Sequence, residues 1–174
     1  MAYLIALEHD PELEARMDDL IDLIGQAQQD DGYLYVPHIC GVTNPEEMGE
    51  TPYSWVIHSH ELYNMGHMYE GAVAYFEATG KRAWVDIAEK SAHHINRVFF
   101  EGDAKYNNGE PINQAPGHQE LEIALCRLYR ATGNALYLEM AQRFLEIRGV
   151  TYRPEGRGIM SPTYAQQHLS LIHI

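Results

Sequence analysis

Apolar side chains recur at spacings of three and four residues in five stretches of the chain, the pattern of amphipathic helices with one buried face. The first stretch begins at Asp10-Pro11, where an N-cap residue precedes proline at the first helical position. A second helix is expected from Ser59, as N-cap, to Thr79, with Gly80 ending it. The other three are expected at residues 82–98, from Pro116 or Gly117 to 133, and at 135–148. The pattern predicts an all-α chain.

Each stretch has a predicted buried face. The second is expected to bury a stripe that includes Leu62, Met65 and Tyr69. In the last stretch, Leu138 and Leu145 are expected to point inward with Ala141 and Phe144.

An internal repeat joins these stretches into helical hairpins. The tripeptide Ala78-Thr79-Gly80 recurs 53 residues later as Ala131-Thr132-Gly133, and each copy leads through a turn into a second helix. One hairpin cannot bury both faces alone, so such units must stack on neighbours. An open solenoid and a closed ring both satisfy this need. Short glycine turns on one side and long polar loops on the other favour a ring with any site at the loop rim.

Two helix starts carry a histidine beside carboxylates. His60 precedes Glu61, and His118 precedes Glu120 and Glu122. In the first turn of a helix the backbone dipole favours neutral imidazole. Neutral imidazole can donate and accept hydrogen bonds, as the hydroxyls of a sugar require. The alternative for both histidines is a structural, partly buried imidazole.

Pairs of possible metal ligands also occur at helical spacing. His118 with Glu122 is an i, i+4 pair, and His67 with Glu70 is an i, i+3 pair. Neither pair has the third and fourth ligands of a zinc site, so no metal ligand is predicted and ordinary hydrogen bonds are expected.

No catalytic residue is predicted in this chain. Glycosidases commonly use two carboxylates, but Glu61, Glu120 and Glu122 suit a helix dipole better. Cys40 and Cys126 are lone thiols without zinc or disulfide spacing. Cys126 follows Leu125 in an apolar helix and is expected to be buried, whereas Cys40 is expected to be accessible.

Composition narrows the class of partner. The 174 residues fit one domain, and the net charge of −13 argues against nucleic acid and anionic membranes. No apolar run is long enough to span a bilayer, and no signal peptide is visible, so a cytoplasmic location is expected. The sequence does not determine the oligomeric state.

Five motifs in order resemble glycoside hydrolase family 127, the β-L-arabinofuranosidase family. They are Gln28 to Leu34, His60-Glu61-Leu62-Tyr63 with Gly66-His67, the Ala-Thr-Gly-Lys81-Arg82 turn, Pro116 to Glu120, and Tyr164 to His168. The resemblance implies an (α/α)6 barrel, of which this chain would be a part. It also implies an enzyme that releases terminal β-L-arabinofuranose from carbohydrate with retention of configuration.

The resemblance assigns sugar-binding residues to this chain, but no nucleophile and no zinc ligand. His60 and His118 match the family histidines that bind sugar hydroxyls in the −1 subsite. The family's cysteine nucleophile is held by zinc, with further cysteines and a glutamate as ligands, and no residue here matches them. We therefore expect these residues alone to bind no zinc and to be inactive.

The extent of the domain follows from the repeat and from the resemblance. Six hairpins would need about 320 residues, six times the repeat, so the chain is expected to be an incomplete barrel over residues 1–169. After His168 the family continues with Leu-Pro-Val, whereas this chain differs, so residues 170–174 are expected to be a non-native tail.

Two alternative functions stay open, one enzymatic and one not. An unsaturated glucuronyl hydrolase or an N-acylglucosamine epimerase would share the six-hairpin fold, and a basic residue in the pocket would mark either one. A non-catalytic helical-repeat scaffold would instead place His60 and His118 on unrelated surfaces.

Overall fold

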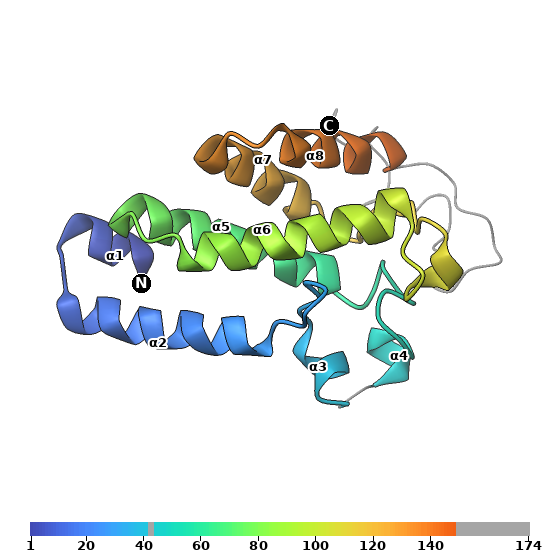
Figure 1. The fold of residues 1–174 in the computed structure, drawn as a ribbon, viewed down its shortest axis with the longest axis horizontal. Helices are drawn as coiled ribbons and strands as arrows, with labels where there is room; N and C mark the ends of the chain where they lie inside the picture. The colour runs from blue at the N-terminus through green and yellow to red at the C-terminus, as the bar shows by residue number, and fades with distance from the viewer. Residues whose placement is uncertain (42–43, 149–174) are drawn as a thin grey trace.

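The computed structural model describes residues 1–41 and 44–148, and this part of the chain consists of helices and loops without a β-strand (Figure 1). The helices are α1 (Ala2–Leu7), α2 (Pro11–Ala27), α3 (Val36–Ile39), α4 (Pro45–Met48), α5 (Glu61–Thr79), α6 (Ala83–Asn96), α7 (Glu120–Thr132) and α8 (Ala135–Ile147), with a π-helical turn η1 (Arg97–Glu101) and a 3-10 turn η2 (Asn107–Gly109).

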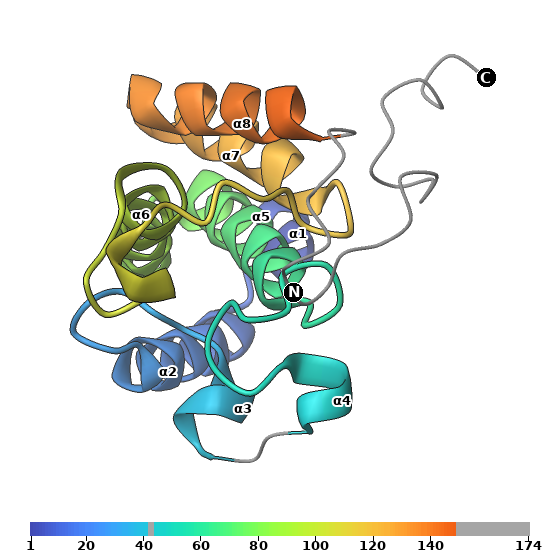
Figure 2. The ribbon, with the colours of Figure 1, turned by 90° about the vertical axis from the view of Figure 1, so that its right-hand side faces the viewer.

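The long helices form two layers, and Figure 2 looks nearly along α5 and α6, with α8 running across the view. Helix α5 packs against α1 and α7 in one layer, and α6 packs against α2 in the other. The hairpins α5–α6 and α7–α8 connect the layers, as the repeat predicts. The expected all-α fold, part of an (α/α)6 barrel, is therefore observed.

The contact between α5 and α7 is the centre of the core. Leu62 and Tyr69 of α5 and Leu121 and Leu125 of α7 are almost completely buried. Gly66 makes the close approach possible, because a Cβ there would lie 2.7 Å from Glu120 Cγ and 3.0 Å from its carbonyl carbon. The first turn of α7 is thereby held against α5.

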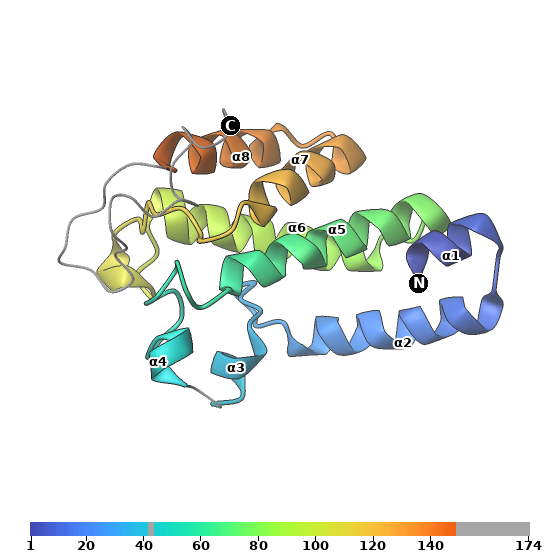
Figure 3. The same ribbon diagram turned by 180° about the vertical axis from the view of Figure 1, so that it is seen from behind.

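Short turns and long loops lie at opposite ends of the hairpins (Figures 1 and 3). Gly80 and Gly133 end α5 and α7 with φ of 75° and 76°, a left-handed conformation that glycine adopts at no steric cost. The other end carries α3, α4 and the loop of residues 102–119. His60 and His118 lie at this loop end, as expected for a rim site.

Two helix starts differ from the sequence prediction. The N-cap of α5 is His60 rather than Ser59, since the Ser59 hydroxyl donates instead to the Glu61 carboxylate at 2.7 Å. Helix α7 begins at Glu120, later than Pro116 or Gly117, because residues 115–119 remain in a loop in which Gly117 packs against Ile57. Both histidines therefore precede the first turn rather than lying within it.

The register of α8 also differs. Leu138 and Leu145, expected inside, are 44% and 40% exposed. Tyr137 and Met140 are fully buried in their place, together with the expected Phe144. Tyr137 is held inward because its hydroxyl donates to Glu89 of α6 at 3.0 Å.

Other expectations concern membranes and the C-terminal part. Among the described helices, none combines the length and apolar character needed to cross a membrane. The motif Tyr164 to His168, the boundary at residue 169 and the tail at 170–174 lie outside the described residues.

Candidate functional site

His60 and His118 meet at the rim although they belong to different hairpins. Their rings are stacked, with centroids 5.3 Å apart and planes at 25°. The ring of Tyr63, one turn into α5, lies 4.9 Å from His118 and 5.9 Å from His60. His60 is exposed and His118 is half-buried, so imidazole edges and an aromatic ring are offered together at one surface.

The backbone explains why the rings meet. His60 has φ 59° and ψ 13°, a left-handed conformation uncommon outside glycine, which turns the chain sharply into α5. Gly117 packs directly on the preceding loop, where a Cβ would come within 2.3 Å of the Ile57 carbonyl oxygen. Only a residue without a side chain allows this approach, and the next residue is His118.

A buried ion pair between Arg148 and Glu122 holds the loop that carries His118. The Arg148 guanidinium and the Glu122 carboxylate are 0% and 4% exposed, and Arg148 Nε donates to Glu122 Oε1 at 3.0 Å. The same guanidinium donates to the carbonyl oxygens of Pro116, at 2.9 Å, and His118, at 3.4 Å. Arg148 thus connects the C-terminal end of α8 to the backbone that presents His118.

Glu61 anchors the other half of the site. Its buried carboxylate accepts hydrogen bonds from the Tyr33 hydroxyl at 2.6 Å, the Ser59 hydroxyl at 2.7 Å and the Tyr53 amide at 3.1 Å. Burial raises the pKa of Glu61, and these hydrogen bonds oppose that rise. With its oxygens directed at the loops that flank His60, Glu61 positions the backbone there.

Most tyrosines near the rim are buried in the core, whereas Tyr63 reaches the surface. Tyr33, Tyr53 and Tyr69 are buried in the core, where Tyr33 and Tyr53 pack edge to face at 5.3 Å. Tyr63 is half-buried beside the histidines. A cavity of about 290 Å³ opens next to His60, and Trp55 and His58 also line it.

The environment of His118 favours its neutral form. Partial burial lowers the pKa of His118, and the nearby His60 and Arg148 lower it further. A neutral imidazole can donate and accept hydrogen bonds at neutral pH, as a pair of sugar hydroxyls requires.

The described residues do not fit the cysteine-held zinc that the resemblance implies. Cys40 is exposed beside α3, whereas Cys126 is half-buried within α7 against the core. Within residues 1–41 and 44–148, the potential metal ligands that gather in a group of three are His67, Glu70 and Glu120, without a cysteine.

Sequence reasoning missed two contributors to this region. Arg148 was not singled out, and Glu120 was not joined to the His67–Glu70 pair. Placing the repeats side by side at their 53-residue spacing would have pointed to Glu120, since it occupies the position equivalent to His67. Arg148 had no such signal.

The fold and the rim together define the class: an (α/α) barrel of helical hairpins with a polar, aromatic site at the loop ends of its inner helices. Comparison with known proteins identifies the family. The model of the β-L-arabinofuranosidase GH127 catalytic domain matches residues 1–174. The chain belongs to the GH127 family.

Individual relatives agree with this assignment. The non-reducing end β-L-arabinofuranosidase of Bifidobacterium longum subsp. longum is 38% identical over 148 residues, 85% of this chain and 21% of the relative. The GH127 β-L-arabinofuranosidase Ara127N-Se from Geobacillus stearothermophilus T6 matches with a TM-score of 0.75 and 42% identity, over 88% of this chain and 22% of that one. The GH127 β-arabinofuranosidase BT3674 matches with a TM-score of 0.77 and 38% identity, over 87% and 23%. The chain thus spans about a fifth of the length of these relatives.

Proposed function

We propose that this chain contributes the sugar-binding histidines of a glycoside hydrolase that releases terminal β-L-arabinofuranose from carbohydrate. The observation that carries the proposal is the stacked pair His60–His118, contributed by two repeat-related hairpins and flanked by Tyr63. Both histidines match the sugar-binding positions of the family. Membership of the family supplies the reaction class.

The geometry suits a small neutral sugar. Imidazole nitrogens of neutral histidines can each bond a ring hydroxyl, while the Tyr63 ring offers an apolar face to sugar C–H groups. Their spacing lets one sugar ring contact both histidines, which a scaffold with the two residues on unrelated surfaces would not allow.

The same geometry disfavours an acidic sugar. Enzymes that act on uronic acids or on other acidic sugars would place a basic side chain in the pocket. Arg148 is the basic residue that donates a hydrogen bond to the His118 carbonyl oxygen, and its guanidinium is buried and paired with Glu122. Its charge is balanced within the protein rather than offered to a substrate.

The finer mechanism belongs to the longer protein that we propose contains these residues. There, the resemblance supports a retaining reaction with a zinc-held cysteine nucleophile. These residues alone would bind sugar and lack activity. We also propose a cytoplasmic location, with carbohydrate rather than nucleic acid or membrane as partner.

A titration of the chain tests the proposal. Methyl β-L-arabinofuranoside should perturb the imidazole resonances of His60 and His118 in nitrogen-proton NMR spectra, and methyl α-L-arabinofuranoside should do so less. His60→Ala and His118→Ala should each weaken binding at least about 10-fold, the loss of one or two hydrogen bonds. His93→Ala, an exposed histidine on α6, is the matched control. Equal binding by all three variants would refute the role of these histidines.

A further inference from the structure

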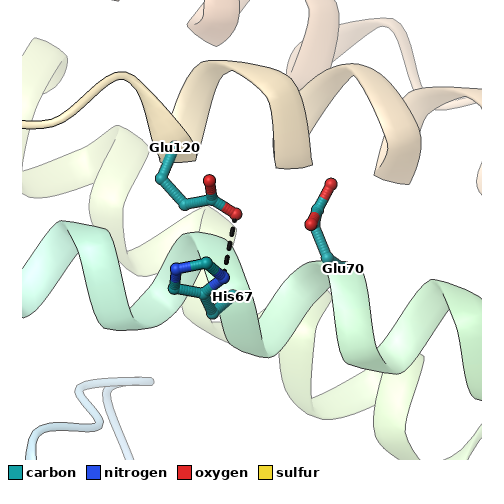
Figure 4. Close-up of side chains that lie close together, drawn as sticks. All are labelled: His67, Glu70 and Glu120. Atoms are coloured by element: carbon teal, nitrogen blue, oxygen red, sulfur yellow. Dashed lines mark ion pairs between the residues drawn. The ribbon is translucent and has the colours of Figure 1, made fainter.

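A second group of polar side chains lies on α5 and α7, below the rim (Figure 4). His67 and Glu70 come from α5 and Glu120 from α7, and one ligand atom of each lies within 4.8 Å of the others. His67 Nδ1 is 3.1 Å from Glu120 Oε1. Two ligands on one zinc ion, each about 2.0–2.2 Å from it at a tetrahedral angle, lie about 3.3–3.5 Å apart. The observed separation is close to that value.

The helices hold these groups in place without a metal. His67 and Glu70 are three residues apart and share one face of α5. Glu120 is the first residue of α7, and Gly66 lets its backbone approach α5 at the level of His67. The group is therefore organised by the most closely packed contact of the fold.

The orientation of Glu120 indicates a missing partner. Its Oε1 atom is buried, yet it makes no hydrogen bond within the described part of the chain. His67 Nδ1 is near enough but is not aligned as a donor to it. Burying a carboxylate oxygen without a hydrogen bond is costly, so a further group is expected where the two side chains converge.

The local charges also favour a cation. The carboxyl groups of Glu70 and Glu120 lie in the same group of side chains, and two carboxylates this close repel each other when both are ionised. Arg127 Nε lies 3.3 Å from Glu70 Oε1 and offsets part of the charge. Its side chain is 43% exposed, and an ion pair of this kind contributes only about 0–1 kcal/mol, so a metal ion can compete.

We propose that His67, Glu70 and Glu120 bind a divalent transition-metal cation of the zinc type. One imidazole nitrogen and two carboxylate oxygens suit zinc and leave a position for water, whereas magnesium and calcium prefer oxygen ligands alone. Tyr63 separates this site from the histidine pair, since its ring lies 4.5 Å from His67 and 4.9 Å from His118. A bound cation would sit one aromatic ring away from the proposed sugar site.

Calorimetric titration of the 174-residue chain with Zn²⁺, after treatment with a chelator, tests the proposal. We expect one site in the micromolar range or tighter, and the visible spectrum of the Co²⁺ form should show nitrogen and oxygen ligands. His67→Gln and Glu120→Gln should each weaken Zn²⁺ binding at least about 10-fold. Arg127→Gln should strengthen it, because the competing guanidinium is removed.

The matched control is the double variant His9→Gln/Glu14→Gln, which removes another histidine–glutamate pair, 2.8 Å apart, at the start of α2. It should bind Zn²⁺ like the unaltered chain. Circular dichroism would show whether each variant is folded. His67 is half exposed, so its replacement is expected to leave the fold intact. If Glu120→Gln unfolds, the Zn²⁺ affinity of His67→Gln tests the proposal. Unchanged affinity in His67→Gln, or no binding by the unaltered chain, would overturn the proposal.

Discussion

The imidazole of His118 is stacked on that of His60, 5.3 Å between centroids, across the junction of two repeat-related hairpins. Burial and the nearby His60 ring both lower the pKa of His118. The neutral form of His118 is therefore favoured near pH 7, and its protonation depends on a residue of the other hairpin.

Removing His60 should raise the pKa of His118. Burial is the main cause that lowers this pKa, and His60 is the next. In His60→Ala both effects weaken, because the ring and its potential charge are lost and water reaches His118. Titration of the imidazole resonances by NMR would measure the rise, and His93→Ala serves as the control. An unchanged pKa of His118 would show that the two rings are not coupled in solution.

Sugar affinity should fall when His118 becomes protonated. Since the folded pKa of His118 is below its ordinary value of 6.5, the neutral form persists under mildly acidic conditions. Binding of methyl β-L-arabinofuranoside should be constant near pH 7 and fall as pH drops through that lowered value. Affinity that rises on acidification would contradict a neutral imidazole at the site.

Glu122→Gln should be strongly destabilising. The substitution leaves the Arg148 guanidinium buried without its counter-charge, and breaking a buried pair typically costs about 3–5 kcal/mol. Asp86→Asn breaks the exposed Arg82–Asp86 pair and should cost under about 1 kcal/mol. Urea unfolding of both variants would compare the two costs. Similar values for both would mean that Arg148 reaches water when Glu122 is altered.

Gly117→Ala should separate the two loops that present the histidines. The new Cβ would meet the Ile57 carbonyl oxygen at 2.3 Å, and backbone cannot move aside as a flexible side chain can. A cost of about 1–3 kcal/mol is expected, with shifted resonances for His60 and His118. Gly25→Ala in α2 is the control, because its Cβ meets only the flexible end of Ile87 at 3.3 Å. Stability and resonances unchanged by Gly117→Ala would contradict the close approach.

His94 should make folding sensitive to mild acid. Burial lowers the pKa of His94 to about 4, although Asp31 opposes this and Arg97 adds to it. As pH falls below 6.5 the unfolded chain binds a proton first, so the contribution of His94 to stability is complete above about pH 6.5 and is lost between there and about pH 4. The loss could reach about 3 kcal/mol. The free energy of unfolding should become less pH-dependent in this range in His94→Gln, but not in His93→Gln.

Local sequence signals predicted the hairpins well. The Asp10-Pro11 start of α2 and the glycines that end α5 and α7 are visible as single-residue signals, and the structure has all of them. The stripe of α5 is buried as expected because apolar residues there follow one helical period. The all-α class followed from these signals together with the repeat, whereas the (α/α)6 barrel followed from the family resemblance.

The site depended on contacts that no local pattern reports. His60 and His118 could be placed at helix starts, but their stacking depends on Gly117 meeting Ile57. Likewise, Glu120 completes the group with His67 only because α7 packs on α5 at Gly66. In α8, Tyr137 and Met140 face the core in place of Leu138 and Leu145, and the Tyr137 hydroxyl bonds Glu89 of α6, a contact that local periodicity does not report.

The separation of His60 and His118 along the chain has a consequence for folding. Each hairpin brings together residues close in sequence, and such local contacts form quickly. The two histidines meet only when α5 docks on α7, which requires closure of the long segment that contains α6 and the loop of residues 102–119. We therefore expect the hairpins to appear first in refolding, and the histidine pair to be assembled in the slower docking step.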